Sequence, residues 1–166
     1  MSQESGDYKE RYNKIYSENE ALFGDGKPDK VAIDIVKHRT SGAALELGAG
    51  QGRNSLLLAQ NGFEVTAQDI SEIGIDGLKK AAAEKGLNIH AEVADVRQLH
   101  WDSNFDVLIT TFMLHHLTRE EALRVIKQMQ EHTSAEGLNA IAAFTKKGIF
   151  ITKIQKQKNF TSNPRS

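Results

Sequence analysis

The residues of this sequence that are suited to chemistry gather around one glycine-rich segment, AALELGAGQGRNSLLLA. Gly48, Gly50 and Gly52 form the pattern Gly-x-Gly-x-Gly. Glycines allow positive backbone φ angles and let a ligand approach the backbone without meeting a Cβ atom. Nicotinamide-binding enzymes carry Gly-x-Gly-x-x-Gly instead, and here position 53 is arginine. The segment therefore predicts a buried strand, a ligand-binding turn and the start of a helix, but not the usual dinucleotide turn.

The charged residues beside these glycines indicate which ligand the turn would hold. Glu46 lies two residues before the first glycine, where its carboxylate would repel the pyrophosphate that a dinucleotide places at a helix N-terminus. A carboxylate there suits a ligand with cationic groups, and S-adenosylmethionine carries an ammonium and a sulfonium. Arg53 would then pair with the carboxylate of its methionine moiety. We therefore interpret the turn, including Ala49, as an S-adenosylmethionine site.

Two further segments place acidic residues at successive strand ends. Asp69 follows Gly48 by 21 positions, close to the about 20 expected for the acidic residue that binds ribose hydroxyls in a βαβ nucleotide site. Ile70 is expected to lie against the adenine face. Asp95, expected at the end of the third strand, would accept hydrogens from the adenine amino group, and the Val96 amide would donate to a ring nitrogen.

The fourth strand end, in FDVLITTFMLHHL, is where an acceptor would approach the methyl group. His115, His116 and Tyr12 are the candidates for taking a proton from a hydroxyl or amine acceptor. Neighbouring residues on a helix do not face the same way, so we expect no metal site from the two histidines. The alternative for Tyr12 is packing, because the tyrosines at positions 8, 12 and 16 form a stripe at helical spacing.

The elements that would position these residues alternate between strands and helices. Strands are expected at 43–47, 64–68, 88–94, 105–110 and 138–144. Helices are expected at 27–38, from about 53 to 60, at 71–85 and from the capping box at Thr118 and Glu121, with Gly137 ending the connection after the last. Such alternation predicts a Rossmann-like three-layer α/β/α sandwich with a mostly parallel sheet.

Length and composition limit the number of domains, the location and the partners of the protein. With 166 residues, 39% hydrophobic and 26% charged, we expect one domain at 1–148, with an N-terminal helical lid at 1–40 and a basic tail at 149–166. The chain has no cysteine, which excludes thiolate chemistry. No apolar run reaches the about 20 residues of a membrane span and no secretory signal is recognisable, so a cytoplasmic location is expected. Residues 1–144 carry a net charge of −7, which argues against nucleic acid as a partner.

In order, the motifs LELGAGQG, VTAQDIS, VADVRQL and FDVLITTFMLHHL resemble those of class I methyltransferases. More narrowly, GRNSLLLAQNGFEVTAQDIS resembles the tellurite-resistance (TehB-like) branch, and YKERYNKIYSENEALFGDGKPD resembles the extension of that branch and of thiopurine-type relatives. The resemblance runs from about Tyr8 to Gly148. It implies methyl transfer from S-adenosylmethionine, with S-adenosylhomocysteine as product, to a small acceptor such as a tellurite or selenite oxyanion, a thiol or a heteroaromatic. It also implies the cofactor roles above, Thr111 near the methionine end, and an N-terminal helix that closes over the site.

The C-terminal segment departs from that family pattern. Class I methyltransferases continue after the fifth strand with a helix and an antiparallel strand pair, which residues 145–166 do not resemble, so we expect the last two strands to be missing. Loss of one G near Gly148 in an A/T-rich gene would turn a family-like Gly-Asp-Phe-Tyr into Gly-Ile-Phe-Ile; a naturally short chain is the alternative. Residues 138–144 would then form an open sheet edge, paired with Ile149–Ile154 or in a homodimer. The competing functions are a non-catalytic S-adenosylmethionine-binding protein and a nicotinamide oxidoreductase.

Overall fold

The chain alternates strands and helices as predicted. The structure is a computed structural model that describes residues 3–18, 26–145, 148–151 and 155–156. Its strands are β1 (Gly42–Leu47), β2 (Phe63–Asp69), β3 (Ile89–Val93), β4 (Phe105–Thr111), β5 (Thr133–Thr145), β6 (Gly148–Ile151) and β7 (Gln155–Lys156). Its α-helices are α1 (Gln3–Glu18), α2 (Lys30–His38), α3 (Arg53–Gln60), α4 (Glu72–Glu84) and α5 (Arg119–Glu131).

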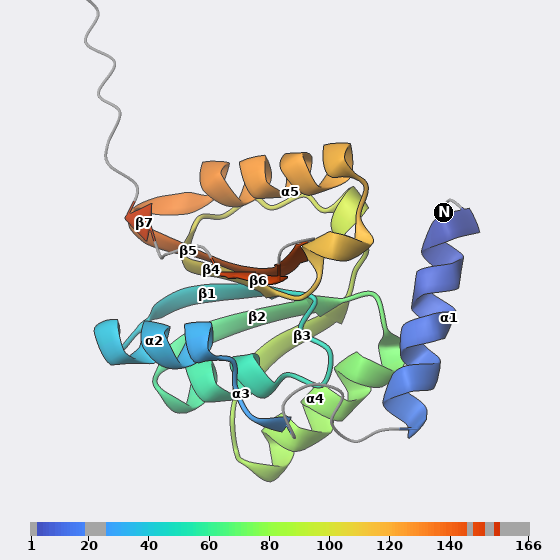
Figure 1. Ribbon diagram of the computed structural model, residues 1–166. Coiled ribbons are helices and arrows are strands. Elements are labelled where there is room, and N and C mark those ends of the chain that lie inside the picture. Colours follow the sequence, from blue (N-terminus) through green and yellow to red (C-terminus); the bar gives the residue numbers. More distant parts are fainter. Residues whose placement is uncertain (1–2, 19–25, 146–147, 152–154, 157–166) are drawn as a thin grey trace, which may run out of the picture.

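The strands form one sheet in the order β3-β2-β1-β4-β5-β6. Strands β1 to β5 pair in parallel with their neighbours, and β6 and β7 pair antiparallel to β5. Helices α2, α3 and α4 cover one face and α5 covers the other, while α1 stands beside the sheet (Figure 1). The three-layer α/β/α fold is therefore confirmed. The carboxyl ends of β1, β2 and β4 meet at one edge, which is where open α/β sheets bind ligands.

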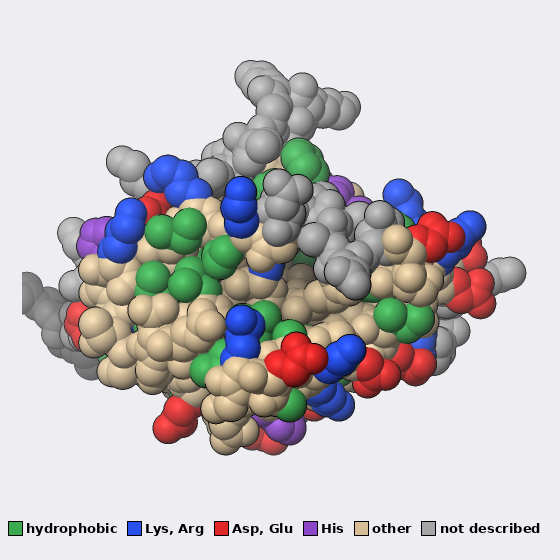
Figure 2. All heavy atoms as spheres, turned by 90° about the horizontal axis from the view of Figure 1, so that it is seen from below, with side chains coloured by type: hydrophobic (Ala, Val, Ile, Leu, Met, Phe, Trp, Pro, Cys, Tyr) green, Lys and Arg blue, Asp and Glu red, His purple; other side chains and the backbone are tan. Residues whose placement is uncertain are grey.

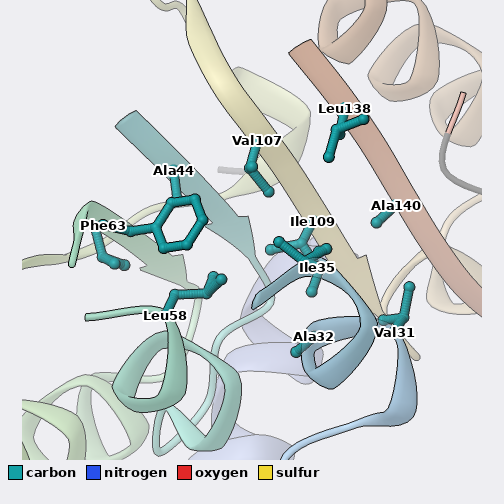
Figure 3. Close-up of a cluster of buried hydrophobic side chains, with 11 residues drawn as sticks. Val31, Ala32, Ile35, Ala44, Leu58, Phe63, Val107, Ile109, Leu138 and Ala140 are labelled. Carbon is teal, nitrogen blue, oxygen red and sulfur yellow. The ribbon is translucent and has the colours of Figure 1, made fainter. Parts of the chain in front are cut away.

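Two apolar cores hold these strand ends in place. On the face covered by α2 and α3, Ile35 and Leu58 pack on Ala44, Val107 and their neighbours (Figure 3). Each fully buried side chain of this size contributes about 1.5–3 kcal/mol through the area removed from water. The opposite core packs α5 against the sheet through a second apolar cluster (Leu45, Leu47, Trp101, Leu108, Leu114, Val125 and Met129).

Trp101 belongs to this second core. Its side chain is buried, and its Nε1 donates a hydrogen bond of 3.3 Å to Oε1 of Gln68. The His132 ring packs edge-on against the indole and hydrogen-bonds to the Trp101 carbonyl through Nε2 at 2.8 Å. Through these contacts, Trp101 fixes the loop between β3 and β4 to the core.

The starts of two helices are fixed by side-chain caps, one of which was predicted. The Thr118 hydroxyl accepts from the Glu121 N–H while the Glu121 carboxylate accepts from the Thr118 N–H, so the capping box at α5 is confirmed. Ser71 caps α4 by accepting from Gly74 N–H. The predicted start of α2 at Lys27 was wrong: the helix begins at Lys30, with extended backbone at its N-cap Asp29.

The fifth strand begins earlier than predicted. β5 starts at Thr133, and its pairing with β4 jumps from Phe105↔Thr133 to Val107↔Leu138. The prediction that Gly137 ends a connection was therefore wrong, because this glycine lies inside an irregular part of the strand. A Cβ atom at Gly137 would come within 2.5 Å of the Thr133 methyl carbon, so the tight bulge requires glycine.

The expectation of an open β5 edge was wrong as well. Ala142–Thr145 pair with residues 148–151 of β6, and Leu138 and Asn139 pair with residues 155–156 of β7. The alternative that Ile149–Ile154 would pair at this edge is confirmed for 149–151, whereas 152–154 lie outside the described residues. Two short strands thus follow β5, although we expected the last two strands to be missing, and they pair with its outer side at 138–139 and 142–145.

The surface that the structure describes carries charges of both signs. Figure 2 shows Lys and Arg side chains beside Asp and Glu side chains over the face seen from below. Among the described helices, none is long and apolar enough to span a bilayer.

Candidate cofactor site

The glycine turn between β1 and α3 has the predicted backbone. Gly48, Gly50 and Gly52 adopt φ angles of 72°, 53° and 84°, which L-residues with a side chain rarely adopt. The amides of Gly48 and Ala49 both donate to the Gln68 carbonyl, at 2.8 and 3.1 Å. The turn is therefore tied to the end of the neighbouring strand β2.

Side chains from other segments pack closely against these three glycines. A Cβ atom at Gly48 would meet Met113 at 2.7 Å, one at Gly50 would collide with the Tyr16 hydroxyl, and one at Gly52 would collide with Leu78. We predicted that the glycines leave room for a ligand. The structure adds that they also let three other segments close around the turn.

Asp69, the predicted ribose ligand, closes the same turn from β2. Its Oδ2 accepts from the Gly50 amide and its Oδ1 from the Ser71 amide, both at 2.8 Å. The side chain is buried, and this burial raises its pKa, while the amide hydrogen bonds act in the opposite direction. A buried carboxylate with spare lone pairs is suited to accept hydrogen bonds from hydroxyl groups.

Glu46 lies at the centre of a buried polar network. Its two carboxylate oxygens accept from Asn54 Nδ2 at 2.9 Å and from Ser55 Oγ at 2.5 Å. Asn54 Nδ2 also lies 3.2 Å from Thr111 Oγ1. Burial raises the pKa of Glu46 to about 7, although the Ser55 and Asn54 hydrogen bonds lower it in part. The network joins β1, α3 and β4 directly behind the glycine turn.

Sequence reasoning missed Asn54 and Ser55, although both are essentially fully buried. The available signal was two small polar residues directly after a glycine turn, at the first turn of an otherwise apolar helix. A buried carboxylate on the preceding strand needs donors, and the first turn of the following helix is the nearest place to supply them.

Arg53 is held by an ion pair that the sequence did not indicate. Its Nη2 lies 2.7 Å from Oδ2 of Asp29, and its Nη1 donates to the Lys27 carbonyl at 3.2 Å. Both side chains are largely shielded from solvent. Arg53 therefore ties the segment before α2 to the glycine turn, and the predicted contact with a methionine carboxylate would have to share or replace this pair.

The end of the third strand differs from the prediction. β3 ends at Val93, so Asp95 is not the last residue of a strand; it caps the short 3₁₀ helix Val96–Gln98. Its Oδ1 accepts from the Arg97 amide at 3.0 Å and from Arg97 Nε at 2.8 Å. The remaining carboxylate oxygen, Oδ2, is the one suited to the adenine amino group.

Helix α1 packs over the site, as the resemblance implied. Asn13 Oδ1 accepts from the Ser71 hydroxyl at 2.7 Å, and Lys9 pairs with Glu72. The rings of Tyr8, Tyr12 and Tyr16 line the cavity beneath the helix. The extension is thus docked through polar contacts to the start of α4.

The two histidines lie closer together than helical spacing predicted. They belong to the 3₁₀ helix Leu114–His116, and their ring centroids are 3.9 Å apart. The Tyr12 hydroxyl and His116 Nε2 are hydrogen-bonded at 2.5 Å. Burial lowers the pKa of His116 to about 4, helped by nearby His115 and Arg11, and burial likewise lowers the pKa of His115. In the described chain, no group of three or more His, Asp and Glu side chains is arranged to hold a metal ion.

These features surround one cavity of about 540 Å³, a size typical of small-molecule sites. The structure places every predicted cofactor residue on its wall (Glu46, Gly48, Ala49, Gly50, Gly52, Arg53, Asp69, Ile70, Asp95, Val96 and Thr111). Among the proton-acceptor candidates, Tyr12 and His116 line the cavity. His115 does not, because it stacks behind His116 and lies 5.1 Å from the ring of Phe144.

Comparison with known proteins shows the family of this chain. The sequence profile of the family described as "Tellurite resistance protein TehB" matches residues 8–163. The chain belongs to this family. A "Probable S-adenosyl-L-methionine-dependent methyltransferase TehB" from Haemophilus influenzae (strain 10810) is 35% identical over 136 residues, which cover 82% of this chain and 44% of the relative. This chain thus spans less than half the length of that TehB protein.

Solved structures agree with this family and with the fold. The crystal structure of TehB from Haemophilus influenzae matches with a TM-score of 0.67 at 33% identity, covering 82% of this chain and 46% of that one. For the fold alone, magnesium protoporphyrin IX methyltransferase (ChlM) from Synechocystis PCC 6803, solved with bound S-adenosylmethionine, matches with a TM-score of 0.72 at 20% identity. It covers 96% of this chain and 82% of its own. The TehB-family chain thus has the methyltransferase fold.

Proposed function

We propose that this TehB-family chain binds S-adenosylmethionine in the described cavity and transfers its methyl group to a small-molecule acceptor. The observation that carries the proposal is the buried Glu46 carboxylate behind the glycine turn. A site that presents a carboxylate at this turn suits a cationic ligand and disfavours a pyrophosphate. Two relatives are named "Probable S-adenosyl-L-methionine-dependent methyltransferase TehB", and these names support the same interpretation.

Different residues line the two ends of the cavity. Asp69, Ile70 and the segment from Asp95 to Arg97 line the end beside β2 and β3, which suits ribose and adenine. Glu46 and Thr111 lie behind the glycine turn, at the carboxyl ends of β1 and β4, which suits the amino-acid moiety. When bound, S-adenosylmethionine supplies a methyl group activated by a sulfonium. The protein holds the acceptor in line with it, an effect worth up to about 7–11 kcal/mol for well-oriented reactants.

The family name favours tellurite as one acceptor, and thiols and heteroaromatics remain the other classes to test. A non-catalytic S-adenosylmethionine-binding protein is the second function, because this chain spans less than half of its TehB relatives. A nicotinamide oxidoreductase is disfavoured, since the Glu46 carboxylate would repel a pyrophosphate at this turn and position 53, the last glycine of the dinucleotide pattern, is arginine.

Calorimetric titration of the chain with S-adenosylmethionine, with NAD as the control ligand, tests the proposal. We expect micromolar binding of S-adenosylmethionine and none of NAD. Assays of methyl transfer then separate the enzyme from a non-catalytic binding protein. A folded protein that binds NAD but not S-adenosylmethionine would overturn the cofactor assignment.

A further inference from the structure

The Tyr16 ring of α1 packs between the glycine turn and the first turn of α4. A Cβ atom at Gly50 would collide with the Tyr16 hydroxyl, and one at Gly74 would come within 3.2 Å of the ring carbons Cδ2 and Cε2. A side chain at Gly50 would therefore displace the ring, and one at Gly74 would crowd it. Tyr16 also lines the cavity, so the two glycines let α1 bring a phenol hydroxyl to the cavity wall directly beside the turn.

The docking of α1 fixes the place of this hydroxyl. Asn13 precedes Tyr16 by one helical turn on the same face of the helix, and its Oδ1 accepts from the Ser71 hydroxyl at 2.7 Å. The Ser71 amide donates in turn to Oδ1 of Asp69 at 2.8 Å, and Oδ2 of Asp69 accepts from the Gly50 amide. Connected hydrogen bonds therefore hold α1, the proposed ribose ligand and the glycine turn together, which preorganises the Tyr16 hydroxyl for a ligand.

The Tyr16 phenol is a neutral hydrogen-bond donor close to two acidic side chains. Burial raises the pKa of this phenol above its ordinary value of 10.0, and Asp69, Tyr12 and Glu46 raise it further, whereas Arg53 lowers it in part. The hydroxyl therefore keeps its proton at pH 7 and can donate it to an acceptor. The influence of Asp69 and Glu46 also shows that the hydroxyl lies within electrostatic reach of both buried carboxylates of the site.

The cofactor brings a negative charge of its own to these carboxylates. The amino-acid moiety of S-adenosylmethionine carries its ammonium and its carboxylate on one carbon atom, so an ammonium at Glu46 brings the carboxylate to the same end of the cavity. There it faces the negative charges of Glu46 and Asp69, and like charges shielded from water repel each other strongly. A donor beside the turn offsets this repulsion, because a hydrogen bond to an ionised acceptor is stronger than one to a neutral acceptor.

Arg53 is the donor that the sequence indicated for this carboxylate. Its Nη2 pairs with Asp29 at 2.7 Å and its Nη1 donates to the Lys27 carbonyl at 3.2 Å. If its guanidinium turned to a ligand, it would leave Asp29 without its counter-charge in a largely shielded position, which is costly. The Tyr16 hydroxyl can donate to the same carboxylate without breaking an ion pair.

We infer that Tyr16 is a cofactor-binding residue, whose hydroxyl donates a hydrogen bond to the carboxylate of the methionine moiety; this rests on the function proposed above. The contact does not involve the transferred methyl group, so S-adenosylhomocysteine forms it as well. Tyr16 thereby favours ligands with a complete amino-acid moiety over adenosine derivatives that lack the carboxylate.

Two ligands that differ only in the carboxylate test the contact by calorimetry: S-adenosylhomocysteine and its decarboxylated analogue. Tyr16→Phe removes the hydroxyl and keeps the ring between the two glycines. We expect this variant to bind S-adenosylhomocysteine about tenfold or more weakly, through loss of a hydrogen bond to a charged group, and to bind the analogue with less than a twofold change. Ser17→Ala is the control, because Ser17 is exposed and its hydroxyl donates to the Lys14 carbonyl; it should leave both affinities unchanged.

The same two titrations of Arg53→Gln decide between the two donors. A selective loss of S-adenosylhomocysteine binding in Arg53→Gln and none in Tyr16→Phe would assign the carboxylate to Arg53 and overturn the inference. Equal losses of both ligands in Tyr16→Phe would also overturn it, because the hydroxyl would then serve the ribose or the fold. In each of these cases the chain still binds S-adenosylmethionine, and the cofactor proposal stands. A folded chain that does not bind S-adenosylmethionine at all would instead remove the proposed function, and this inference with it.

Discussion

The Gly50 amide donates a 2.8 Å hydrogen bond to Oδ2 of Asp69, so a carboxylate at the end of β2 closes the glycine turn that follows β1. The same carboxylate accepts from the Ser71 amide and thereby fixes the start of α4. One side chain thus links the turn, the proposed ribose position and the helix on which α1 docks. Changes at Asp69 should therefore affect the cofactor and the fold together.

Asp69→Ala should weaken S-adenosylmethionine binding by about tenfold to several-hundredfold, because charge-assisted hydrogen bonds contribute about 1.5–3 kcal/mol each. It should also lower the melting temperature, because two backbone amides lose their acceptor. Asp69→Asn, which keeps one acceptor oxygen but turns an NH2 donor toward the other backbone N–H, should restore only part of the stability and of the affinity. Calorimetry and thermal unfolding measure the two effects, and unchanged affinity in both variants would mean that the ribose binds elsewhere.

Glu46 should make both stability and cofactor binding depend on pH. Its pKa in the folded chain, about 7, lies above its ordinary value of 4.5, so the folded state holds a proton that the unfolded state has released. The free energy of unfolding should therefore decline as the pH rises from about 4.5 through 7, and Glu46→Gln should flatten this slope in denaturant titrations.

A cationic cofactor beside Glu46 should also lower the pKa of its carboxyl group and release a proton on binding near pH 7. Calorimetry in two buffers of different ionisation enthalpy measures that proton. Proton release that persists unchanged in Glu46→Gln would assign it to another group.

The Arg53–Asp29 pair should act mainly on stability. Asp29→Asn and Arg53→Gln should each lower the free energy of unfolding by about 1.5–3 kcal/mol, the range for hydrogen bonds to charged groups. The double variant should cost little more than either single one, because both remove the same interaction. Asp34→Asn, which breaks an exposed pair with Lys30, is the control and should have the smaller effect. If the single variants keep full stability yet bind S-adenosylmethionine weakly, Arg53 acts on the ligand as the sequence predicted.

Gly50→Ala and Gly86→Ala form a matched pair for the glycine turn. Both residues have positive φ angles, 53° and 64°. An alanine in this left-handed conformation therefore destabilises the folded state of either variant by about 1–2 kcal/mol. A Cβ atom at Gly86 meets nothing within 4 Å, whereas one at Gly50 collides with the Tyr16 hydroxyl. Gly50→Ala should therefore unfold more easily and lose S-adenosylmethionine binding. Equal behaviour of the two variants in thermal unfolding and titration would show that packing of Tyr16 does not constrain the turn.

The sequence by itself determined the order of the elements and predicted which residues would line one cavity. Alternating apolar runs, the Thr118 cap and the positive-φ glycines are short-range features, so they can be recognised within a window of a few residues. Acidic residues near successive strand ends then predicted the cavity wall, because parallel strands bring their carboxyl ends to one edge. All eleven predicted cofactor residues line one cavity for that reason.

Only the tertiary structure decided which partners these residues have. Arg53 meets Asp29 across 24 positions, and Tyr12 meets His116 across 104. Asn54 and Ser55 are buried because α3 presses its first turn against Glu46, and β5 is covered because the chain turns back on it. Such contacts depend on how layers pack and on which loops meet, and a local sequence pattern carries no information about either.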